Sequence, residues 1–99
     1  MATVHKDKIS SFAGLAAGAT HQFHWNNPPW DTGLAYFAYP DPPAAIGEHG
    51  TRTGSVEITR IVCVHKRDNH NGDHQHVLID VKNTGSEATD VDLYQIWIT

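Results

Sequence analysis

The sequence lacks several features that would assign it to a specialised class of protein. It contains a single cysteine, Cys63, so an internal disulfide framework is excluded. Its seven lysine and arginine residues are scattered along the chain, and the formal net charge is −4 with neutral histidines. Nucleic-acid binding needs a concentrated basic patch, so we expect no nucleic-acid partner.

Long apolar runs are also missing. No segment approaches the roughly eighteen apolar residues of a membrane-spanning helix, so we expect no membrane span. The opening residues, MATVHKDKISSF, contain no apolar stretch of the length that a signal peptide requires. These two absences favour a cytoplasmic protein, or a secreted protein without a leader sequence.

Helical periodicity is weak throughout the chain, whereas strand character recurs. The best helix candidate, residues 12–20, is short and is weakened by Gly14 and Gly18. Short runs with strand character recur at 4–12, 20–25, 33–39, 55–66, 76–82 and 91–98, and segments rich in proline and glycine separate several of them. The pattern predicts one all-β domain, residues 1–99: an immunoglobulin-like or related Greek-key β-sandwich of about six to eight strands.

The longest strand run, residues 55–66, contains an interruption. Val56, Ile58, Val62 and Val64 occupy alternate positions, and Arg60 falls in the middle of the series. A charged residue at that position indicates either a sheet edge or a β-bulge that changes which side chains face the core.

The carboxyl-terminal stretch DVKNTGSEATDVDLYQIWI carries a strand pattern in which Val81, Asn83 and Gly85 alternate with other residues before a turn and a closing strand. This stretch resembles the last hairpin of bacterial immunoglobulin-like adhesion and accessory modules. The resemblance implies an immunoglobulin-like fold, and it brings no catalytic residues with it.

A histidine-rich segment, KRDNHNGDHQH at residues 66–76, lies between two apolar runs and contains three of the eight histidines. Asn71 and Gly72 are typical of a two-residue hairpin turn. That turn pairs Arg67 with His76 and His65 with Leu78. Val62 and Val64 then lie on the core side with Val77, and His65, His74 and His76 share the opposite face.

Three neutral imidazoles on one face suit Zn²⁺, Ni²⁺ or Cu²⁺, with Cys63 or an aspartate as a further ligand. Arg67 opposes a cation in the same patch, and a solvated polar face needs no metal. Calcium fits residues 68–73 less well, because His70 occupies a ligand position and no bidentate glutamate follows. Protonation of all eight histidines would make the net charge of the chain positive. A free imidazole titrates near pH 6.5, so we expect this change in mildly acidic solution.

Six of the nine aromatic residues lie between Phe23 and Tyr39. We expect Phe23, Trp25 and Phe37 in the core and Trp30 and Tyr39 at the surface. An exposed indole beside amide and carboxylate groups is typical of sugar binding, because the ring stacks on the pyranose while the polar groups bond its hydroxyls. The candidate ligand-binding residues are Asn26, Asn27, Trp30, Asp31 and Tyr39.

The sequence shows no arrangement typical of catalysis. It has three glutamates, none of them in the aromatic segment, and no phosphate-binding glycine loop. We therefore predict a non-enzymatic, lectin-like or surface-recognition protein that binds a carbohydrate or a protein partner through the aromatic loop and the histidine-rich tip. The alternatives are a metal-binding protein and a small self-assembling subunit, a homo-oligomer joined through the edge of its terminal strand.

Overall fold

The computed structural model describes residues 2–28, 33–45, 47, 50–70 and 72–99. All the regular secondary structure of these residues is β-strand, which confirms the all-β prediction. The strands of the described residues are β1 (Val4–Leu15), β2 (Thr20–Asn26), β3 (Gly33–Asp41), β4 (Val56–Asp68), β5 (Gly72–Asn83) and β6 (Thr89–Ile98). Each corresponds to one of the runs that the sequence predicts.

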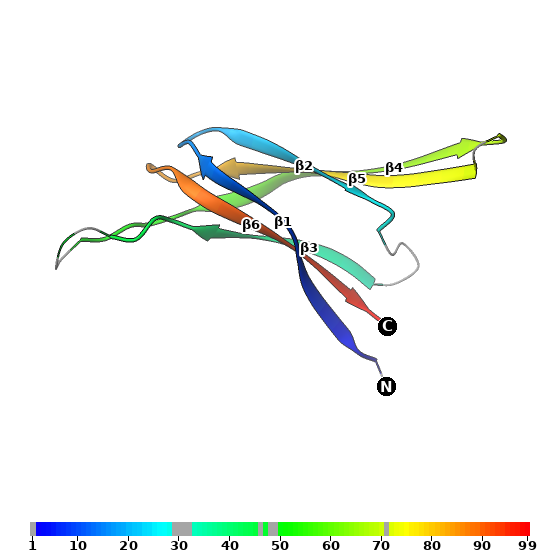
Figure 1. Ribbon diagram of the computed structural model, residues 1–99, viewed down its shortest axis with the longest axis horizontal. Coiled ribbons are helices and arrows are strands. Elements are labelled where there is room, and N and C mark those ends of the chain that lie inside the picture. Colours follow the sequence, from blue (N-terminus) through cyan, green and yellow to red (C-terminus); the bar gives the residue numbers. More distant parts are fainter. Residues whose placement is uncertain (1, 29–32, 46, 48–49, 71) are drawn as a thin grey trace.

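These strands form two three-stranded antiparallel sheets (Figure 1). Sheet A has the order β1-β6-β3, and sheet B has the order β2-β5-β4. The chain changes sheet at every connection except the β4–β5 hairpin. The stretch that resembles the last hairpin of immunoglobulin-like modules is not a hairpin in this structure, because β5 pairs with β2 and β4 whereas β6 pairs with β1 and β3.

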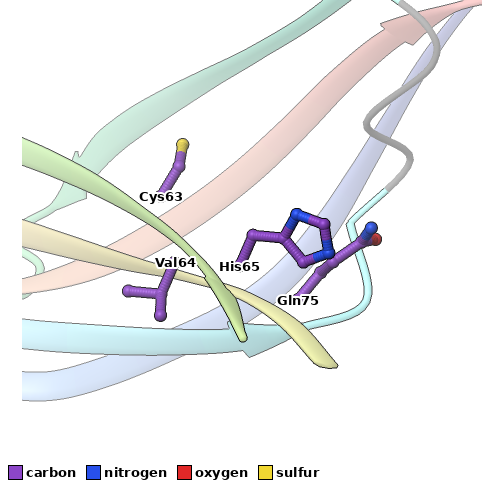
Figure 2. Close-up of a pocket in the computed structure, with 4 residues that line it drawn as sticks. All are labelled: Cys63, Val64, His65 and Gln75. Atoms are coloured by element: carbon purple, nitrogen blue, oxygen red, sulfur yellow. The ribbon is translucent and has the colours of Figure 1, made fainter. Parts of the chain in front are cut away.

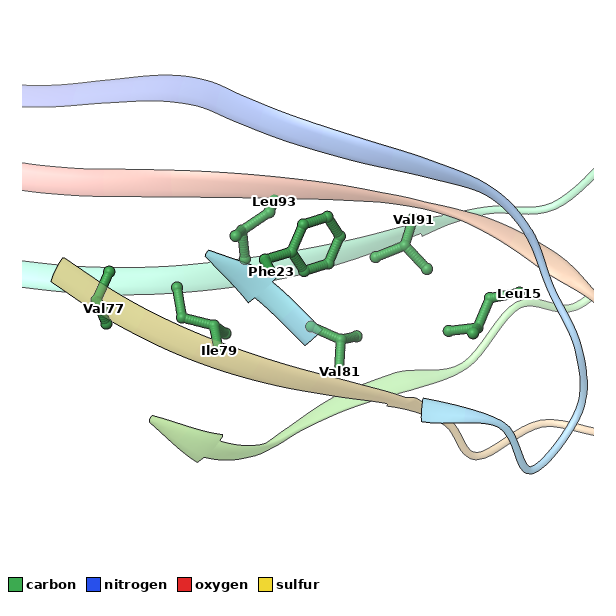
Figure 3. Packing of buried hydrophobic residues seen from close by; sticks show 7 residues of the cluster. All are labelled: Leu15, Phe23, Val77, Ile79, Val81, Val91 and Leu93. Carbon is green, nitrogen blue, oxygen red and sulfur yellow. The ribbon is translucent and has the colours of Figure 1, made fainter. Parts of the chain in front are cut away.

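Apolar side chains from both sheets meet in one core (Figure 3). The central strand of each sheet supplies alternate residues to it, and those of β5 are completely buried. A fully buried aliphatic side chain contributes about 1.5–3 kcal/mol relative to an exposed one, so these two strands dominate the packing energy. The buried members of the core are Leu15, Phe23, Val77, Ile79, Val81, Val91 and Leu93.

The molecule is elongated, since the strands extend beyond this shared core. The radius of gyration is 16.4 Å and the longest dimension is 59 Å, whereas a compact domain of about 100 residues has a radius of gyration near 13 Å. Figure 1 shows the two sheets diverging toward the end that carries both termini and the β4–β5 turn. Ile61 of the edge strand β4 is 47% exposed although it pairs with the buried Ile79.

A β-bulge in β4 decides which of its side chains face sheet A. The pairing with β5 shifts between Ile58 and Arg60, and β4 is also an edge strand, so both explanations of the interrupted pattern hold. Beyond the bulge, Ile61 rather than Val62 shares a face with Ile79. The sequence-based placement of Val62 and Val64 on the core side is therefore wrong, because the extra residue reverses the alternation of the strand.

Asn83, at the end of β5, is completely buried and joins two connections between the sheets. Its side-chain Nδ2 donates hydrogen bonds to the carbonyl oxygens of Leu15, at 2.9 Å, and of Glu87, at 2.8 Å. Its Oδ1 accepts a bond of 2.9 Å from the amide of Gly85. One amide group therefore holds the end of β1 next to the segment that leads from β5 to β6.

Replacing Asn83 tests the importance of this junction. We expect Asn83→Ala to lower the free energy of unfolding by about 2–4 kcal/mol, because it removes the partners of two carbonyl groups and one amide. Urea denaturation measures the change. Asn69→Ala, at an exposed position of the β4–β5 turn, is the matched control and should change stability by less than about 0.5 kcal/mol. Equal effects of the two substitutions would contradict this role of Asn83.

Candidate functional site

The histidine-rich hairpin has a different pairing from the one predicted. Arg67 pairs with Asp73 rather than His76, and His65 pairs with Gln75 rather than Leu78. The Asp68 Oδ1 atom accepts a hydrogen bond of 2.8 Å from the amide of His70, and Gly72 adopts a φ of 79° that favours glycine. Asn71 lies outside the described residues. The strands therefore continue to Asp68 and Gly72, and the connection is longer than a two-residue turn.

This pairing separates the three predicted metal ligands. Directly paired residues of an antiparallel sheet project from the same face. His65 therefore lies on the inner face of sheet B with Cys63 and Gln75, whereas His74 and His76 lie on its outer face. The described residues contain no group of three or more histidine, cysteine, aspartate or glutamate side chains arranged to hold one metal ion.

The carboxylates expected in a calcium loop bond to groups of the hairpin itself. Asp68 accepts the His70 amide, and an Asp73 carboxylate oxygen lies 3.3 Å from His65 Nε2. These contacts stabilise the turn and the strand pair that precedes it.

A pocket of about 260 Å³ lies on the inner face of sheet B. Its described lining is Cys63, Val64, His65 and Gln75. Figure 2 shows the side chains of Cys63 and Val64 projecting from opposite sides of β4. Tyr36 of β3, in sheet A, interacts electrostatically with Cys63. Burial raises the pKa of the Tyr36 hydroxyl to about 12, and the charge of Cys63 adds to this effect. That hydroxyl donates a hydrogen bond of 3.0 Å to Oε1 of the buried Gln95.

A second surface, the outer face of sheet A, carries three aromatic rings that we call the aromatic strip: Phe37, Tyr39 and Tyr94. Phe37 is paired with Tyr94, and their ring centroids are 6.2 Å apart. The centroids of Phe37 and Tyr39 are 6.3 Å apart, and these two residues are 44% and 52% exposed. The expectation that Phe37 lies in the core is wrong, because its neighbours Tyr36 and Ala38 take the core-facing positions of β3.

Acidic groups border the aromatic strip on one side. Tyr39 is paired with Asp92, and Asp41 is paired with Asp90 one step further along the two strands. The three carboxylates, together with Ser11, Phe12 and Ala13, line a shallow depression of about 120 Å³. Hydrogen-bond acceptors therefore lie directly beside exposed aromatic rings.

Basic and apolar groups border the strip on the other side. Lys6 places its Nζ atom 4.7 Å from the centroid of Tyr94 and 5.8 Å from that of Phe37, which is cation–π geometry. Val4 and Ile98 follow on the same face, and they are 67% and 45% exposed. The outer face of sheet A thus changes along its length from apolar to aromatic to acidic.

The structure describes three of the five predicted ligand-binding residues, and it places Asn26 and Tyr39 on different sheets. Tyr39 belongs to the aromatic strip, whereas Asn26 lies on the outer face of sheet B, on the other side of the molecule. Asn27 has a φ of 53° and donates its backbone N–H to the carbonyl of Gln75. Trp30 and Asp31 lie outside the described residues. The sequence-based prediction did not include Tyr94 and Asp92. Their alternation with the apolar Leu93 is the pattern that indicates an outward-facing position for both.

Comparisons of the chain with protein-family models, with curated proteins and with solved structures found no match. Among the described residues, no helix is long and apolar enough to cross a membrane.

The raised pKa of Tyr36 predicts how stability changes in alkaline solution. Below pH 10 the hydroxyl is protonated in both states; between pH 10 and about 12 the unfolded chain loses this proton while the folded chain keeps it. The free energy of unfolding therefore falls as pH rises through this range. We expect the native protein to lose more stability across it than Tyr36→Phe, as measured by urea denaturation at several pH values. An equal loss in both proteins would contradict the assignment.

Proposed function

We propose that this chain is a non-catalytic carbohydrate-recognition protein whose binding surface is the outer face of sheet A. The observation that carries the proposal is the aromatic strip lying directly beside Asp41, Asp90 and Asp92. Sugars present an apolar face of C–H groups and a rim of hydroxyl groups. Exposed aromatic rings bind the first by stacking, and carboxylates accept hydrogen bonds from the second.

Binding through the aromatic strip also costs little conformational entropy. Tyr94 lies on the central strand β6, and Phe37 lies beside it on β3, so both rings are held by a sheet whose other face packs into the core. Phenylalanine and tyrosine have few rotatable bonds, so ordering them on binding costs little conformational entropy. A rigid platform of three neighbouring rings suits an extended oligosaccharide better than a small solute.

A second copy of the chain is the alternative occupant of the same face. Val4, Phe37, Tyr39 and Ile98, all on this face, are among the large apolar side chains that the described residues expose. Exposed apolar patches are also typical of interfaces between protein subunits. The carboxylates favour the sugar, since Asp41, Asp90 and Asp92 can accept hydrogen bonds from sugar hydroxyls, whereas an apolar subunit interface would remove their hydration.

The order of the strands supports an immunoglobulin-like relationship as part of this proposal. Immunoglobulin domains place strands B, E and D side by side in one sheet and strands C and F in the other. The order β2-β5-β4 and the pair β3-β6 follow that arrangement in chain order. β1 takes the position beside β6 that the last strand, G, has in an immunoglobulin domain.

Sugar binding by the aromatic strip can be tested with a glycan array followed by calorimetry on the best neutral oligosaccharide. We expect Tyr39→Ala to weaken binding about tenfold or more, because it removes an exposed stacking surface. Tyr39→Phe keeps the ring and should retain most of the affinity. His70→Ala, at an exposed position of the β4–β5 turn, should bind like the native chain.

Sedimentation velocity over a range of protein concentrations separates the two occupants. A monomer that binds an oligosaccharide through Tyr39 supports the proposal. A dimer that Phe37→Ala dissociates, together with no binding to any sugar on the array, would replace it with self-association.

A further inference from the structure

Two histidines meet on the outer face of sheet B, away from the aromatic strip. His24 of β2 is paired with Leu78, and Asn26 is paired with His76 of β5, so His24 and His76 are diagonal neighbours on one face. Their ring centroids are 4.9 Å apart and the ring planes meet at 88°. The sequence-based metal site included His76 but placed it with His65, which lies on the inner face.

The distance between the two rings matches that of two imidazoles on one metal ion. With metal–nitrogen bonds of about 2.0–2.1 Å and an angle near tetrahedral at the ion, the two ring centres are roughly 5 Å apart. The observed T-shaped contact has the right separation but points the edge of one ring at the face of the other. His24 is exposed, so a change of its side-chain torsions can turn its nitrogen toward the edge of His76.

The surroundings leave both rings available as ligands. Within the part of the chain that the structure describes, neither imidazole has a hydrogen-bond or ion-pair partner, and their one recorded contact is with each other. Two imidazoles that contact each other without a polar partner gain little from that contact beyond ring packing, whereas a shared cation uses a lone pair of each.

The charges near the pair also permit a cation. Arg67, which the sequence placed in the same patch as His76, lies on the inner face of the sheet and pairs with Asp73. Leu78 and Val64 lie directly beside His24 and His76 and provide apolar surroundings. The nearest lysine along the outer face, Lys66, is paired with His74, one step further toward the hairpin turn.

We infer that His24 and His76 form a two-histidine site for a borderline divalent transition-metal ion, Zn²⁺, Ni²⁺ or Cu²⁺. Imidazole nitrogens are preferred ligands of these ions, and water completes the coordination. Such a site bridges the edge strand β2 to the central strand β5, so metal binding to the folded chain should also raise its unfolding temperature.

The test uses untagged, metal-free protein and titrates it with NiCl₂ and ZnSO₄ in a calorimeter. We expect one ion per chain, and we expect His24→Ala and His76→Ala each to weaken binding about tenfold or more. The matched controls are His65→Ala, on the inner face of the hairpin, and His70→Ala, at its turn; both should bind as the native chain does. Circular dichroism of each metal-free variant establishes that it is folded.

A spectroscopic readout on the native chain tests the same site without any substitution. The electron paramagnetic resonance spectrum of one equivalent of Cu²⁺ should show splitting from imidazole nitrogens, and the His24→Ala spectrum should lose part of it. Binding that survives both His24→Ala and His76→Ala, or that disappears in His65→Ala, would overturn the inference. So would a native chain that binds none of the three ions.

Discussion

The buried amide of Asn83 is the interaction on which the arrangement of the two sheets most depends. β5 and β6 carry most of the core but belong to different sheets, so the short segment between them must cross from one sheet to the other. Asn83 bonds to that segment through Glu87 and Gly85, and to the end of β1 through Leu15. The sheets are closed at this end. Toward the opposite end the sheets diverge, as Figure 1 shows.

One extra residue in β4, together with the β4–β5 turn, determines which face of sheet B each β4 side chain occupies. The bulge between Ile58 and Arg60 reverses the alternation of the strand, and the turn at Asp68 sets the pairing beyond it. A strand has a repeat of two residues, so each single-residue shift moves a side chain to the other face. His65 therefore faces inward, and His76 finds its neighbour on β2 rather than on β4. The chemistry of this surface depends on a pairing register that the histidine spacing does not contain.

The positions of the strands could be predicted from the sequence because alternation and breakers are local signals. Which side chains of each strand face the core was harder to predict, because this depends on the pairing with strands that are distant in the chain. The segment GLAYFAY has aromatic residues on both faces, so its pattern does not say which face is buried. Tyr36 faces inward, where its hydroxyl bonds to Gln95, and Phe37 is left at the surface. Tyr39 lies at the surface as the sequence predicts, whereas Tyr94 joins the aromatic strip only because β3 pairs with β6.

The two proposed binding surfaces have the same structural basis. On β6, Leu93 is buried in the core while the next residue, Tyr94, carries the aromatic strip. On β5, Val77 is buried while the preceding residue, His76, meets His24. Each surface therefore lies on the outer face of a central strand, β6 or β5, whose inner face is buried in the core. Because a side chain on a central strand moves little without its buried neighbour, the core that gives the protein its stability also fixes the spacing of the rings on both outer faces.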